Sequence, residues 1–118
     1  MVSQSAILKF GILSSLDSST LTGTFQILGS PLAFPARIVK ITNTSNVGAT
    51  ISVDGVTSID FVPATSFVLY DCGTNRGNGA PSMDIQEGTQ FYAKGSAGTG
   101  LIYLTYLYAE YPPITISL

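Results

Sequence analysis

Four aspartates are the first candidates for chemistry in this chain, because grouped carboxylates bind calcium or magnesium. They are Asp54, Asp60, Asp71 and Asp84. The Asp-x-Asp-x-Asp spacing of a calcium-binding loop is missing. Asp54 falls in a turn, where Asp caps backbone N–H groups, and Asp60 alternates with apolar neighbours, as a residue that faces solvent or a partner does. The sequence favours structural roles for these residues and predicts no metal site.

The chain lacks the residues that usually support a catalytic nucleophile. The chain has one cysteine, Cys72, and no histidine, which excludes a Cys–His nucleophile and removes the commonest general base. One cysteine also excludes an intramolecular disulfide, and we expect a small, buried or half-buried thiol. A hydrolase would need a carboxylate pair such as Asp71 with Glu87, for which the spacing gives no support. We predict that the protein is not an enzyme and has no cofactor.

Residues 95–100, Gly-Ser-Ala-Gly-Thr-Gly, are as rich in glycine as a phosphate-binding loop. Such a loop requires a preceding strand, a following helix, and a Lys before Ser or Thr. In this chain an apolar strand follows the glycine-rich segment, and the required Lys does not follow it. The segment therefore predicts the turn of a β-hairpin. A second motif, the glycosylation pattern Asn43-Thr44-Ser45, is expected to be a chance match, because the start of the chain lacks secretory-signal features.

Tyrosines recur along the apolar run of residues 101–111. A row of exposed rings would suit a carbohydrate or single-stranded nucleic acid, but no basic residues are interleaved with these tyrosines. Tyrosine on a strand more often fills a core or an oligomer interface. After Pro112-Pro113, apolar residues alternate with Thr115 and Ser117, which predicts a terminal strand that needs a neighbour. The expected interface residues are Tyr103, Tyr106, Tyr108, Tyr111, Ile114, Ile116 and Leu118.

The composition points to assembly. Of the 118 residues, 45% are hydrophobic and only 10% charged, against about a quarter charged in ordinary domains. A surface with so few charges is either covered by Ser, Thr, Asn and Gly or buried against other subunits. The net charge of −2 and scattered basic residues argue against nucleic-acid binding, and no apolar run approaches the length of a membrane helix. We expect a chain made in a cytoplasm, without nucleic-acid or membrane partners.

The elements that must position these residues are strands. Val, Ile, Thr, Tyr and Phe dominate, helical periodicity is missing, and turn residues recur at short intervals. The clearest signal is Asp54-Gly55, a hairpin turn between two strands; residues 16–20 and 72–82 are expected to be loops. About eight short strands predict an all-β fold, an antiparallel, jelly-roll-like β-sandwich. An apolar stretch at residues 6–13 precedes the expected strands, which are residues 22–28, 37–43, 49–53, 58–62, 65–71, 84–86, 90–94 and 101–109.

Three regions are expected along the chain. Residues 1–21 form an N-terminal arm or edge strand with a Ser/Thr-rich loop. Residues 22–111 form the β-sandwich. Residues 112–118 form an apolar tail strand for contact between subunits.

One long segment resembles small virion proteins of tailed bacteriophages. It carries Ser52-Val53-Asp54-Gly55, then Asp-Phe-Val-Pro-Ala at residues 60–64 and Phe-Val-Leu-Tyr-Asp at residues 67–71, with further similarity at residues 28–32, 88–100 and 102–105. The likeness covers about residues 22–108 and leaves out the tail after Pro113. These are turn and strand patterns and supply no catalytic residues.

The resemblance implies a non-enzymatic virion structural protein, a capsid decoration (cement) protein made in the bacterial host. Its expected partners are itself, with a trimer favoured, and the major capsid protein or other virion proteins. Two alternatives stay open. One is a tail or head–tail accessory, and the other is a module that binds a host surface or glycan through residues 73–82 and 95–100.

Overall fold

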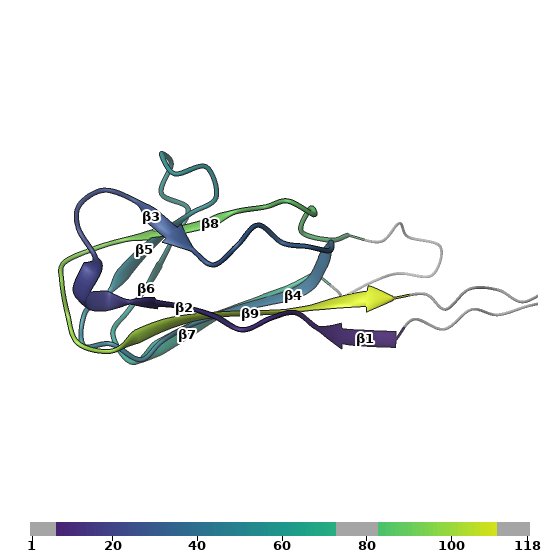
Figure 1. The fold of residues 1–118 in the computed structure, drawn as a ribbon, viewed down its shortest axis with the longest axis horizontal. Helices are drawn as coiled ribbons and strands as arrows, with labels where there is room; N and C mark the ends of the chain where they lie inside the picture. Colours follow the sequence, from purple (N-terminus) through teal and green to yellow (C-terminus); the bar gives the residue numbers. More distant parts are fainter. Residues whose placement is uncertain (1–6, 73–82, 111–118) are drawn as a thin grey trace, which may run out of the picture.

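The structure, a computed structural model, describes residues 7–72 and 83–110, which fold into nine strands and one short 3₁₀ helix. Residues 73–82 of the loop predicted at residues 72–82, and the predicted tail strand, lie outside the described residues. The described part is an all-β sandwich of two antiparallel sheets, as the strand patterns predict (Figure 1).

The two sheets divide the strands unequally. One sheet has five strands: β1 (Ile7–Phe10), β2 (Ser14–Asp17), β4 (Ala36–Asn43), β7 (Ser66–Asp71) and β9 (Leu101–Glu110). The other has four: β3 (Gln26–Leu28), β5 (Ala49–Ser52), β6 (Asp60–Val62) and β8 (Phe91–Lys94).

Strand β9 organises the larger sheet. It pairs with β4 along one edge, while β2 and β1 follow one another along its other edge, opposite residues 101–104 and 107–110. Counting β1 and β2 as one interrupted strand gives eight strands, in the order 1-8-3-6 in one sheet and 2-7-4-5 in the other. This is the strand order of a jelly roll, which confirms the predicted architecture.

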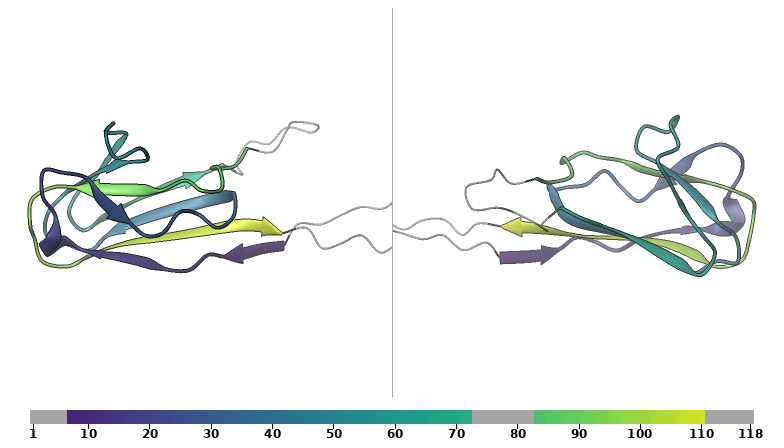
Figure 2. Two further views of the ribbon diagram at one scale, coloured as in Figure 1. Left: turned by 45° about the horizontal axis from the view of Figure 1, so that its top comes forward. Right: turned by 180° about the vertical axis from the view of Figure 1, so that it is seen from behind.

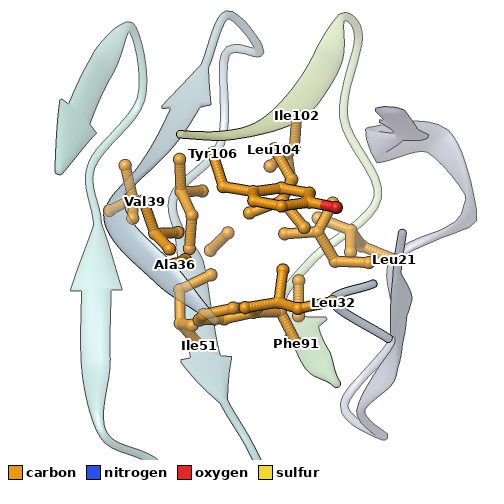
Figure 3. Packing of buried hydrophobic residues seen from close by; sticks show 14 residues of the cluster. Leu21, Leu32, Ala36, Val39, Ile51, Phe91, Ile102, Leu104 and Tyr106 are labelled. Atoms are coloured by element: carbon orange, nitrogen blue, oxygen red, sulfur yellow. The ribbon is translucent and has the colours of Figure 1, made fainter. Parts of the chain in front are cut away.

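The core lies between the sheets and follows from the alternation of side chains along each strand. On β9, Ile102, Leu104 and Tyr106 point inward, and on β8 Phe91 faces them from the other sheet (Figure 3). The buried apolar side chains are Leu21, Leu28, Leu32, Ala36, Val39, Ile41, Ala49, Ile51, Val62, Phe91, Ala93, Ile102, Leu104 and Tyr106.

The predicted hairpin at Asp54-Gly55 is present. Strands β5 and β6 pair antiparallel around it, and Gly55 has a φ of 77°, a conformation that glycine adopts without steric cost. Asp54 Oδ1 accepts hydrogen bonds from the N–H groups of Val56 and Thr57 at 2.8 and 2.6 Å. The turn therefore forms for the local reason that its sequence indicates.

The second predicted hairpin is wrong. Strand β8 pairs with β3 and β5 in the four-stranded sheet, whereas β9 belongs to the five-stranded sheet. Both strands carry an apolar face, and these faces meet across the core instead of lying side by side. Residues 95–100 therefore cross from one layer to the other, and the backbone N–H groups of Gly95 and Gly98 donate to the carbonyls of Thr22 and Ser18.

The N-terminal segment also differs from the prediction. Part of the expected loop at residues 16–20 is strand β2, whose Ser14 and Leu16 lie on the inner face opposite Leu104 and Ile102. The strand expected at residues 22–28 is only three residues long, and residues 84–86 contribute a single bridge, between Ile85 and Ala36. Strands β1 and β2 are thus members of the larger sheet.

Candidate subunit interface

The tyrosines of β9 do not share one face. Tyr103 is half-buried on the outer face of the sheet, opposite Thr42 and Ser15. Tyr106 is only 8% exposed and belongs to the core (Figure 3). Tyr108 lies on the inner face near the end of the sandwich, and its ring stacks on Phe34 with centroids 4.0 Å apart. These three rings therefore form no continuous stacking platform.

The other expected interface residues, Tyr111, Ile114, Ile116 and Leu118, lie outside the described residues, so their contacts stay a prediction. Among the described residues, large apolar side chains are exposed at several places, and five of them lie close together in sequence, on β1 and on the segment that follows it.

Strand β1 is exposed on both faces. It pairs with the last residues of β9, and this pair continues beyond the ends of β4 and β8 (Figures 1 and 2). We call residues 7–10 with residues 107–110 the β1–β9 ribbon. Ile7 and Leu8 are half exposed, Phe10 is 78% exposed, and Ile12 just beyond the strand is 85% exposed. The sequence signal for this surface was the apolar stretch at residues 6–13, which Lys9 interrupts.

Two ion pairs flank this end of the molecule. Lys9 Nζ lies 3.7 Å from a carboxylate oxygen of Glu110 across the ribbon, and both side chains are about half exposed. Arg37 Nε lies 2.9 Å from Asp84 Oδ1, with the arginine mostly buried. The exposed pair contributes little to stability, whereas the second pair fastens the segment before β8 to β4.

A second exposed apolar surface lies on β7, where Phe67 and Leu69 point outward. Lys40 of the neighbouring β4 places its Nζ 4.9 Å from the centroid of the Phe67 ring. This cation–π contact gives the β7 surface a polar partner within the chain, which the apolar side chains of β1 lack among the contacts found in the described residues.

Three of the four aspartates, Asp54, Asp60 and Asp84, serve separate structural roles. The N–H groups of Thr57 and Val56, with the Ser52 hydroxyl, hold the pKa of Asp54 below its ordinary value. Asp60 accepts a hydrogen bond from Tyr70, and Asp84 pairs with Arg37. Within residues 7–72 and 83–110, no group of three His, Cys, Asp or Glu side chains could hold a metal ion.

Residues 95–100 are built as a structural connection. Besides Gly95 and Gly98, the Thr99 N–H is also occupied, since it donates to Asn46 Oδ1 at 2.8 Å. A phosphate-binding loop needs such N–H groups free to point at its ligand. The glycines instead allow close packing: a Cβ at Gly100 would lie 2.6 Å from Ser45 Cα.

The glycosylation pattern falls on a buried side chain. Asn43 is 1% exposed, and its Nδ2 donates to the carbonyls of Val47, Val62 and Pro63, while its Oδ1 accepts from Ser45. This amide joins the end of β4 to the segment after β6. A glycan on Asn43 would require these bonds to break.

The fold and these contacts define a jelly-roll β-sandwich with an exposed apolar edge. No family model, curated protein or solved structure matches the chain. No helix in the described part of the chain is long and apolar enough to cross a membrane.

Proposed function

We propose that the protein is a non-enzymatic structural subunit of a bacteriophage virion, a capsid decoration protein that assembles as a symmetric oligomer. The observation that carries this proposal is the apolar surface of the β1–β9 ribbon and of Ile12 and Leu13 beside it. A small monomer with such an exposed surface would be prone to aggregate, whereas a subunit covers it on assembly.

The architecture supports the same function by analogy. Jelly rolls recur in viral capsid domains, although they also occur in lectins and cupins. The charge balance is compatible with a protein partner, because the scattered basic residues provide no phosphate-binding surface.

Attachment to the particle can be tested directly. Virions are purified from an infected culture of the host whose phage encodes this chain, and their proteins are identified and counted by mass spectrometry. We expect the chain in purified particles, in a copy number that is a multiple of the oligomer and scales with the major capsid protein.

The location on the particle separates the candidate roles. Gold-labelled antibody against the chain should mark the head for a decoration protein, and the neck or tail for an accessory or a host-binding module. A chain that is abundant in the lysate but missing from purified particles would overturn the virion proposal.

A further inference from the structure

We propose that the β1–β9 ribbon joins two copies of this chain, with β1 of one copy lying antiparallel to β1 of the other. This inference deepens the proposed function and rests on it in one respect, the symmetric oligomer. Four features of the ribbon argue for a second copy: its exposed side chains, the outer backbone edge of β1, its area and its charge.

The outer half of the ribbon, residues 7–8 with 109–110, is two-stranded, because the pairing of β4 with β9 extends only to Tyr108. All four residues of β1 are exposed, although Ile7, Leu8 and Phe10 are large and apolar. Two-stranded ribbons are marginally stable in water and need a third strand or a covering surface. A strand from a neighbour would supply the third strand.

The outer edge of β1 offers backbone groups for such a strand. The Gly11 N–H donates to the Tyr106 carbonyl at 2.7 Å, which continues the β1–β9 pairing by one residue. Because N–H groups in an antiparallel ladder point alternately to the two sides, the N–H groups of Leu8 and Phe10 point away from β9. Among residues 7–72 and 83–110, no strand other than β9 pairs with β1, so within this part of the chain the outer edge of β1 has backbone groups for a further strand.

A second copy matches this edge geometrically. Two identical strands related by a twofold axis pair antiparallel, so the donors of each strand meet the acceptors of the other. The five-stranded sheets of the two copies would then continue into one another through β1.

The area of the surface fits an interface of ordinary size. Besides the β1 residues, Ile12, Leu13 and Phe34 are exposed at this end. Together these side chains expose roughly 700 Å², taking about 200 Å² for a fully exposed large side chain, and each partner in a standard interface contributes about 800 Å².

Charge also favours a copy of the same chain. The ribbon carries one cation and one anion, Lys9 and Glu110, which pair with each other. It therefore has no excess charge that would repel its own copy or select a strongly charged partner.

The test compares native masses by light scattering on a sizing column, at several concentrations of the full chain. We expect wild type to be an oligomer, and Phe10→Glu and Ile12→Lys to weaken self-association by about tenfold or more. Both side chains are more than three-quarters exposed, so neither change removes core packing.

Matched controls place the same charges elsewhere. Phe67→Glu on β7 and Val56→Lys in the β5–β6 turn replace side chains that are 61% and 81% exposed. We expect both controls to retain the wild-type mass. Equal loss of the oligomer in the controls, or an unchanged oligomer in both ribbon variants, would overturn the inference.

A wild-type chain that stays monomeric at every concentration would also overturn it, and would mean that another protein or a further segment of this chain covers the ribbon. This outcome is distinct from failure of the proposed function. A monomer that is nevertheless present in purified virions retains the virion role, whereas an oligomer missing from virions retains the interface.

Discussion

Tyr70 donates a hydrogen bond from its hydroxyl to Oδ2 of Asp60, and this bond joins β7 in one sheet to β6 in the other. Burial, and secondarily the Asp60 carboxylate, raise the pKa of Tyr70 above its ordinary value near 10. The two residues therefore fasten the side of the sandwich where β6 and β7 lie.

Replacing Tyr70 with Phe should lower the free energy of unfolding by about 1 kcal/mol at neutral pH, because one partly exposed hydrogen bond is lost. The stabilisation from the raised pKa is fully present below pH 10 and is lost as the pH rises above it, since the unfolded chain then loses the tyrosine proton first. Urea unfolding between pH 7 and 11 should show a shallower alkaline decline in Y70F. Y103F, which changes a tyrosine of the outer face, is the control. A decline as steep in Y70F as in wild type would contradict the assignment.

Asp54 should make the protein sensitive to acid. Its pKa in the folded state is lowered by the N–H groups of Thr57 and Val56, so its contribution is present above about pH 4 and is lost as the pH falls further. We expect D54N to melt at a lower temperature than wild type at pH 7, with a gap that narrows toward pH 2.

Asp17 provides the comparison for this acid effect, because the Ser19 N–H also lowers its pKa. D17N should therefore also melt at a lower temperature than wild type at pH 7. The melting temperature of the double variant should depend least on pH. A gap between D54N and wild type that is constant from pH 7 to 2 would show that the Asp54 charge is not involved.

Two glycines offer a paired test of packing. A Cβ at Gly11 would lie 2.2 Å from Cε1 of the buried Tyr106, and a Cβ at Gly48 would lie 2.2 Å from Cζ of the exposed Phe61. The Phe61 ring has room to turn away and the Tyr106 ring does not. We expect G11A to cost about 1–3 kcal/mol and G48A less than about 0.5 kcal/mol, measured by urea unfolding. Equal costs would mean that Tyr106 is free to move.

The apolar tail is expected to contribute to assembly. Removing residues 112–118 takes away Ile114, Ile116 and Leu118, each of which would contribute about 1.5–3 kcal/mol if fully buried. We predict weaker oligomerisation or weaker attachment to the virion for the chain that ends at Tyr111, measured by native mass and by occupancy in purified particles. Unchanged values of both would refute this role.

Local chemistry accounts for what could be predicted from the sequence. The Asp54-Gly55 turn and the alternating residues of β4 and β7 need only their own neighbours, and they were predicted correctly. The partner of β9 could not be predicted in this way. Residues 95–100 could form either a tight turn or a connection between the two sheets. The strands β8 and β9 belong to different sheets because Phe91 packs against Ile102 and Leu104 across the core.

The sequence did not separate the tyrosines of β9 that face the core from those that face outward, for a related reason. A tyrosine at an inner position of β9 and one at an outer position look alike in a strand whose residues are nearly all apolar, so Tyr106 could not be assigned to the core in advance. Strand β2 was missed because Ser14, Ser15 and Asp17 are poor strand formers. It forms because Ser14 and Leu16 lie on the inner face, opposite Leu104 and Ile102 of β9.

The position of β9 in the sheet has a consequence for how the protein is made. β9 is synthesised after β1, β2 and β4, yet it is the strand with which all three pair. Until residues 101–110 leave the ribosome, these strands have no common partner, and the inner face of β4 has no neighbour from β9. The contacts that complete the larger sheet therefore join distant parts of the chain, and non-local pairing of this kind is associated with slower folding.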